Sequence, residues 1–96
     1  MKILRNRPQL VVDEELRGIC ESILTQGKSA AEWDRIESDD LFQSEHYTGG
    51  YDATEQGFCF SYRDRERREW WFQFSHADAT RIASGQLTHL DMREPD

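Results

Sequence analysis

The sequence predicts an α+β domain in which a helical hairpin and a third helix pack on a small antiparallel sheet. Two patterns lead to this expectation: apolar residues recur with helical spacing over residues 16–24, and aromatic residues alternate with other types over 58–62 and 70–74. The first pattern is typical of an amphipathic helix and the second of strands. Because predicted helices and strands occupy separate stretches of the chain, we expect the helices to cover one face of the sheet.

The first predicted helix covers residues 13–26. Asp13 is a favourable N-cap, and Gly27 supplies the left-handed position that commonly ends a helix. One apolar stripe runs along this helix, formed by Leu16, Ile19, Cys20, Ile23 and Leu24. A capping-box pattern then predicts a second helix over about 30–37. The short connection between the two helices indicates a helical hairpin.

The aromatic runs predict an antiparallel strand hairpin with a loop centred on Glu66. The register that keeps the aromatic residues on one face pairs Phe58 with Phe74, Phe60 with Phe72 and Tyr62 with Trp70. A shift of one residue would scatter these rings over both faces of the sheet, so the alternation selects this register.

The remaining segments are shorter. Pro8 excludes a continuous helix near the N-terminus, so residues 1–12 are expected to form an extended arm or an edge strand. A third helix is expected between Ser75, as its N-cap, and Gly85. A short strand or extended stretch follows it, and residues 93–96 are expected to be frayed.

Length and charge limit the functions that the chain can have. A length of 96 residues provides one hydrophobic core, so residues 1–96 are expected to form a single domain. The net charge is −7, and residues 13–55 carry twelve acids against three basic residues. This acidity favours solubility, or a face that docks onto a basic partner, and it disfavours nucleic-acid binding.

Motifs for membrane insertion, metal binding and catalysis are missing from the sequence. No apolar stretch approaches the roughly 20 residues that cross a bilayer, and no signal-peptide pattern follows the first charges. The chain is therefore expected to be cytoplasmic, with Cys20 and Cys59 as free thiols. No cysteine or histidine spacing is typical of a metal site, and no phosphate loop or nucleophile motif occurs. The sequence thus predicts no catalytic residue, no metal site and no cofactor, and it favours a protein that is not an enzyme.

Trp70 and Trp71 form the most informative pair, because adjacent side chains on a strand point to opposite faces. Trp70 belongs to the aromatic ladder. The other face of the hairpin is expected to hold Trp71 together with Cys59, Ser61, Arg63 and Gln73. If the helices cover the ladder, Trp71 lies on the open face of the sheet and is typical of an interface anchor. If a third layer covers the other face, Trp71 belongs to the core. The sequence leaves both arrangements open.

The favoured function is that of a small acidic protein-binding or regulatory module. Its partner would be another protein or a second copy of itself, as a homodimer. The alternative is a small-molecule-binding domain or a small enzyme, with a pocket around residues 46–58 and Trp71. The expected contact residues, for a ligand or a partner, are Trp71, Arg63, His46, Tyr47, Tyr51 and Asp52.

Overall fold

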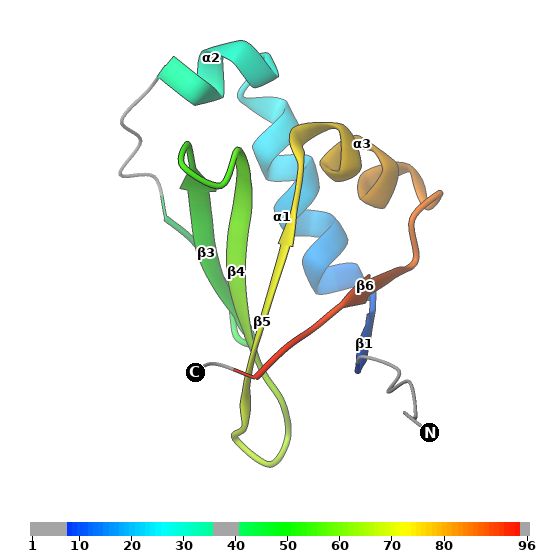
Figure 1. The fold of residues 1–96 in the computed structure, drawn as a ribbon. Helices are drawn as coiled ribbons and strands as arrows, with labels where there is room; N and C mark the ends of the chain where they lie inside the picture. Colours follow the sequence, from blue (N-terminus) through cyan, green and yellow to red (C-terminus); the bar gives the residue numbers. More distant parts are fainter. Residues whose placement is uncertain (1–7, 36–40, 95–96) are drawn as a thin grey trace, which may run out of the picture.

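The computed structural model describes residues 8–35 and 41–94 (Figure 1). In chain order the elements are β1 (Gln9–Val11), α1 (Glu14–Thr25), α2 (Ala30–Arg35), β2 (Phe42–Gln43), β3 (Tyr47–Asp52), β4 (Gly57–Arg63), β5 (Glu69–Phe74), α3 (His76–Ser84) and β6 (His89–Asp91). The strands form a four-stranded sheet, in the order β2-β3-β4-β5, and a two-stranded sheet of β1 and β6. All of these pairings are antiparallel.

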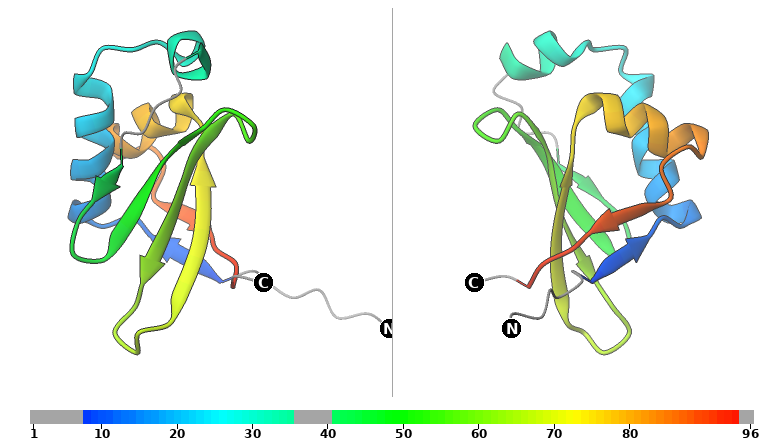
Figure 2. Two further views of the ribbon diagram at one scale, coloured as in Figure 1. Left: turned by 90° about the vertical axis from the view of Figure 1, so that its left-hand side faces the viewer. Right: turned by 45° about the vertical axis from the view of Figure 1, so that its right-hand side comes forward.

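Two parts of the predicted fold are wrong. The described residues form two sheets rather than one. The second sheet arises because β6 pairs with β1, and only Arg93, beyond the end of β6, bridges to Trp71 on the edge of β5. The described residues also do not form the predicted helical hairpin. Instead α1 packs against α3, while α2 lies apart at one end of the four-stranded sheet (Figure 1 and Figure 2).

The position of α2 follows from its one large apolar residue. Trp33 is fully buried. Its ring contacts three rings of the sheet, those of Phe42, Tyr51 and Phe58. The ring of Trp33 therefore anchors this short helix to the sheet. The last residues of the predicted second helix, 36–37, lie outside the described residues.

The predicted first and third helices are confirmed. Asp13 caps α1, because its Oδ1 accepts a hydrogen bond from the Leu16 N–H at 2.9 Å. Gly27 follows α1 with a φ of 69°. Ser75 caps α3, and Gly85 ends it with a φ of 84°. The buried sides of α1 and α3 join the aromatic rings of the sheet in one core.

The predicted register of the aromatic hairpin is also confirmed. Strands β4 and β5 pair Phe58 with Phe74, Phe60 with Phe72 and Tyr62 with Trp70. The four phenylalanine rings stack with centroids between 5.5 and 6.1 Å apart, for example 5.5 Å for Phe58 and Phe74. The ladder therefore forms the covered face of the sheet, under α1 and α3.

Strand β3 completes this face with a close backbone approach. Gly49 lies opposite Phe60 on β4. A Cβ atom at Gly49 would lie 2.2 Å from the carbonyl oxygen of Cys59 and 2.6 Å from the Phe60 ring. Glycine is therefore required at this position, since it makes room for the ring over the backbone of β3.

The two ends of the described chain lie near each other in the second sheet. β1 is the described part of the expected N-terminal arm, and residues 1–7 lie outside the described residues. The Met92 N–H donates to the Pro8 carbonyl at 2.8 Å. Arg93, expected to be frayed, is paired with Trp71, and residues 95–96 lie outside the described residues.

Candidate functional site

The helices leave the second face of the four-stranded sheet uncovered, and Trp71 lies on this face with 45% of its surface exposed. Of the two arrangements that the sequence leaves open, the structure therefore has the open face. One row across this face is formed by Thr48, Ser61, Trp71 and Arg93. A tryptophan this exposed is typical of a binding surface rather than of a core.

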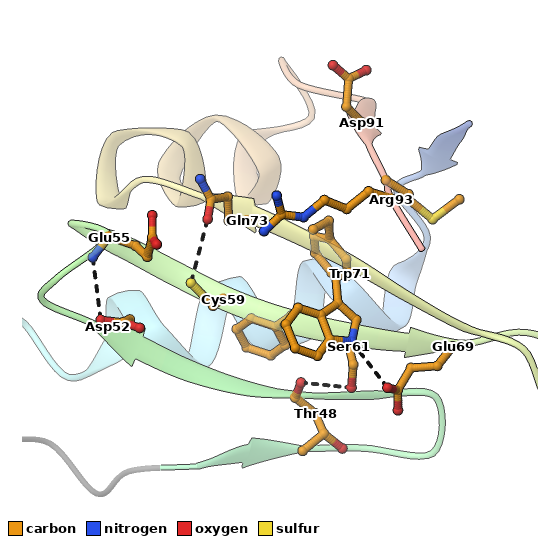
Figure 3. Close-up of a pocket in the computed structure, with 13 residues that line it drawn as sticks. Thr48, Asp52, Glu55, Cys59, Ser61, Glu69, Trp71, Gln73, Asp91 and Arg93 are labelled. Carbon is orange, nitrogen blue, oxygen red and sulfur yellow. Dashed lines mark hydrogen bonds between the residues drawn. The ribbon is translucent and has the colours of Figure 1, made fainter. Parts of the chain in front are cut away.

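A hollow of about 570 Å³ lies over this row (Figure 3). We name it the open-face hollow. Its four acids are Asp52, Glu55, Glu69 and Asp91. Its uncharged polar side chains are Thr48, Cys59, Ser61 and Gln73. Among the described residues that line it, Arg93 is the one cation, so the hollow carries an excess of negative charge.

Trp71 is held in place through both its backbone and its ring. Its N–H donates to the Arg93 carbonyl at 2.7 Å, and the Arg93 N–H donates back to the Trp71 carbonyl at 2.9 Å. Its indole Nε1 donates to Glu69 Oε1 at 3.1 Å. The indole is therefore presented in a fixed orientation with a carboxylate at its edge, and little side-chain freedom would be lost on binding.

Arg93 reaches the hollow from the segment that follows β6. Its side chain extends across the hollow toward Gln73 (Figure 3). Among the described residues no carboxylate forms an ion pair with its guanidinium. The single positive charge therefore offsets the acids of the hollow only in part.

Cys59 lines the hollow in surroundings that disfavour its thiolate form. Burial raises the pKa of its thiol, and the charges of Asp52 and Glu55 raise it further, against a smaller lowering by Arg93. The thiol is therefore protonated at neutral pH, and its Sγ donates a weak hydrogen bond to Gln73 Oε1 at 3.7 Å. A reactive cysteine needs the opposite environment, in which the thiolate is stabilised.

Asp52 shapes the turn at one end of the hollow. Its Oδ1 accepts hydrogen bonds from the backbone N–H groups of Thr54 at 2.9 Å and Glu55 at 3.4 Å. These contacts fix the turn between β3 and β4 and bring Glu55 to the rim. Asp52 and Trp71 are thus the two expected contact residues that the structure places in the hollow.

The other expected contact residues lie elsewhere. Arg63 is on the open face, opposite Glu69, but it does not line the hollow. Tyr47 is buried on the covered face, and its hydroxyl lies 3.1 Å from Asp13 Oδ2, to which it donates. Tyr51 also faces the helices, where its hydroxyl donates to Asp34. The expected pocket around residues 46–58 is therefore divided between the two faces of the sheet.

His46 belongs to a second polar cluster, between the start of α1 and the connection from β2 to β3. Its Nδ1 lies 2.8 Å from Glu15 Oε1, and its backbone N–H donates to Glu15 Oε2 at 2.8 Å. The Ser44 hydroxyl donates to the same carboxylate. These contacts with the Glu15 carboxylate fasten the start of α1 to the connection between β2 and β3.

The pKa values of this cluster move in opposite directions. Burial acts to raise the pKa of Glu15, but the hydrogen bonds from Ser44 and His46 outweigh it, so the pKa lies below its usual range. The hydrogen bond to Glu15 raises the pKa of His46, and the nearby acids act in the same direction. Both shifts stabilise the charged pair.

Sequence reasoning placed Gln73 on the face of Trp71 but overlooked Glu69, Asp91 and Arg93 as residues of the site. Glu69 and Gln73 lie two positions from Trp71 on the same strand, so the hairpin register places them on its face. Glu69 could therefore have been found by alternation alone, as Gln73 was. Asp91 and Arg93 come from the far end of the chain, and no local pattern indicates that this segment meets β5.

Three further observations concern metal ligands, membrane spans and similarity to known proteins. Within residues 8–35 and 41–94, no group of three or more His, Cys, Asp or Glu side chains is arranged to hold a metal ion. The helices of the same residues are all too short or too polar to span a membrane. When the chain is compared with protein-family models, curated proteins and solved structures, no match is found.

Proposed function

We propose that this protein is a non-enzymatic binding module whose open-face hollow docks a basic segment of a partner protein. The observation that carries the proposal is the composition of the hollow: four carboxylates surround an exposed, fixed tryptophan. Tryptophan is the aromatic ring that attracts cations best, and neighbouring carboxylates add Coulomb attraction for the same ligand. An arginine or lysine side chain fits this chemistry.

The arrangement supports a docking role in which charge selects the partner and Trp71 contributes affinity. A cation over an exposed indole contributes about 0.5–1 kcal/mol, and desolvation by the partner increases that value. The acids of the rim would act over a longer range, since complementary charge mainly raises the association rate and excludes wrong partners. Trp71 would then be the central anchor and the acids its polar rim.

The chemistry of the hollow supports binding rather than catalysis. Cys59 is the one thiol among the described residues that line it, and its raised pKa keeps it protonated. Cys20 is buried in the core, and burial raises its pKa to about 12. We place the protein in the cytoplasm, where both thiols would stay reduced.

Fluorescence anisotropy of a labelled peptide tests this proposal. The peptide is a capped hexamer of alternating arginine and glycine, and a glutamate–glycine hexamer is its counterpart. We expect the arginine peptide alone to bind, with an affinity that falls as salt is added. Trp71→Ala should weaken binding by roughly five- to thirtyfold, the equivalent of about 1–2 kcal/mol, whereas Trp71→Phe should keep part of the affinity.

Val11 provides the matched control, because it is an exposed apolar residue on β1, outside the hollow. Val11→Ala should bind the arginine peptide as wild type does. If Trp71→Ala binds as tightly as wild type, the peptide is attracted only by the general acidity of the chain and the proposal fails. Absence of binding to wild type would contradict it as well.

A small cationic molecule is the second candidate ligand. The volume of the hollow, about 570 Å³, lies within the range of roughly 300–1,000 Å³ that is typical of small-ligand sites. A linear polyamine such as spermidine carries several positive charges, which the four acids of the hollow would attract. If spermidine raises the thermal unfolding temperature of wild type but not of Trp71→Ala, at concentrations where the arginine peptide has no effect, this candidate replaces the first.

A further inference from the structure

The loop between β4 and β5, residues 64–68, projects from the sheet. The Asp64 carboxylate at its start holds it in shape by accepting four hydrogen bonds. Asp64 Oδ1 accepts from the backbone N–H groups of Glu66 and Arg68, each at 2.9 Å. Its Oδ2 accepts from Arg68 Nε at 3.1 Å and from Trp70 Nε1 at 3.0 Å. The loop extends past the rest of the sheet at one end (Figure 1 and Figure 2). It is therefore organised before any partner arrives.

This organisation leaves two arginines at the tip of the loop. Arg68 forms ion pairs with both acids of the loop, Asp64 and Glu66. Arg65 and Arg67 are exposed, and neither forms an ion pair with any described residue. Arg67 also has a φ of 66°, in the left-handed region that favours glycine. The chain thus presents an arginine where local conformation would favour another residue.

We infer that the partner of the open-face hollow is a second copy of this chain, whose 64–68 loop supplies the basic segment. The inference rests on the proposed function and names its partner. Arg65 and Arg67 of one copy would meet Trp71 and the acids of the other. No other exposed loop among the described residues combines two arginines without an ion pair.

The geometry allows this contact to be reciprocal. Glu66, in the loop, and Trp71, on β5, are five residues apart in the sequence, so their backbones lie at most about 18 Å apart. A two-fold axis between them, with the open faces opposed, places each tip over the hollow of the other copy. Such an interface closes on itself, so it gives a dimer and not a filament. Each hollow then contains cations from its partner.

Charge reversal tests the inference. The tip variant is Arg65→Glu with Arg67→Glu, and the hollow variant is Glu55→Lys with Asp91→Lys. These acids are chosen because Glu69 holds the indole and Asp52 fixes a turn. Light scattering after size exclusion gives the mass over a wide concentration range. We expect wild type to rise from 11.3 kDa toward twice this mass, and each variant to remain a monomer.

Mixing the two variants is the decisive measurement. In a mixed dimer both contacts join opposite charges, so the dimer mass should return, as it should in a chain that carries all four changes. The matched control, Arg17→Glu with Arg81→Glu, makes the same change in charge on the helices and should leave the wild-type behaviour unchanged. Circular dichroism checks that each variant is folded.

Each other outcome overturns the inference in a recognisable way. A wild type that stays at monomer mass at every concentration, yet binds the arginine peptide through Trp71, contradicts the second copy and leaves the proposed function standing. A dimer that survives the tip variant uses another surface. Folded variants that are monomers alone and in the mixture contradict the pairing of loop with hollow. Failure of the peptide to bind removes both ideas.

Discussion

The two faces of the four-stranded sheet come from the same strands, but one face is aromatic and buried and the other is mostly polar and exposed. The covered face is an aromatic ladder that α1 and α3 bury, and the three phenylalanines Phe58, Phe60 and Phe72 retain at most 5% exposure. The open face alternates with it residue by residue and has polar side chains around Trp71. Trp70 and Trp71 show the contrast most directly, because one step along β5 moves a tryptophan from the ladder to the hollow.

This difference indicates that the covered face contributes most to folding stability and that the open face is available for binding. Residues of the ladder are constrained by packing, since adding or removing one methylene group in a dense core changes the stability of the fold. Residues of the open face touch few neighbours, so the chain can vary them with little effect on folding. A residue such as Trp71, which the fold does not require, is for this reason a strong candidate for function.

The largest expected effect is a difference in unfolding free energy between variants of two neighbours on β4, Phe60 and Ser61. Phe60→Ala should lower the free energy of unfolding by about 3–5 kcal/mol, because it removes a buried ring and leaves a cavity. Ser61→Ala, on the open face, should change it by less than about 0.5 kcal/mol. Denaturant unfolding of both variants measures the contrast. Similar losses for both would show that the open face also supports the core.

A smaller loss of unfolding free energy is expected at Gly49, where the covered face has no room for a side chain. In Gly49→Ala the new Cβ would lie 2.2 Å from the Cys59 carbonyl oxygen, so β3 and β4 must separate or the Phe60 ring must move. We expect a loss of about 1–3 kcal/mol, as for other overpacked sites. Gly18→Ala is the control, since no atom lies within 4 Å of its added Cβ. That variant should be neutral or stabilising, because alanine is the better helix former.

The smallest effect concerns the contact that fastens α1 to the sheet, and it depends on pH. The raised pKa of His46 contributes stability fully below its unfolded value of 6.5, and this stability is lost as pH rises through the folded pKa. The lowered pKa of Glu15 contributes above its unfolded value of 4.5 and is lost as pH falls through the folded pKa. The pair should therefore stabilise the fold most between about pH 4.5 and 6.5.

Unfolding of wild type and His46→Gln across this range tests the contact. The difference in their unfolding free energies should narrow as pH rises above 6.5. Glu15→Gln should remove the part of the acidic loss of stability that comes from the lowered pKa of Glu15. A difference that stays constant from acid to alkaline pH would show that His46 is not charged in the folded state.

Local patterns predicted the elements that depend on local physics. The cap at Asp13 and its apolar stripe indicated α1, and the alternation of rings indicated both β4 and β5 with their register. The same alternation placed Trp71 on the face opposite the ladder, and the structure decides that this face is open. In each case a short stretch of sequence contains the complete reason for the structure.

The errors all concern contacts between distant segments. β1 and β6 are three-residue strands from opposite ends of the chain, and neither shows which strand it pairs with. Trp33 fits a helical hairpin as well as it fits the end of a sheet, until the sheet aromatics are placed. Tyr47 and Tyr51 were assigned to the pocket because the register of β3 was unknown, and that register decides their face.

The single bridge between Trp71 and Arg93 has a consequence for behaviour in concentrated solution. An exposed strand edge can template the addition of further strands and so begin aggregation. At one edge of this sheet β2 is only two residues long, and at the other edge Arg93 occupies the outward backbone groups of Trp71 at the middle of β5. Arg93 also places its positively charged side chain near the backbone N–H and carbonyl of Trp71, with which an incoming strand would pair. The chain can thus display a tryptophan on an open sheet while its edges discourage fibril growth.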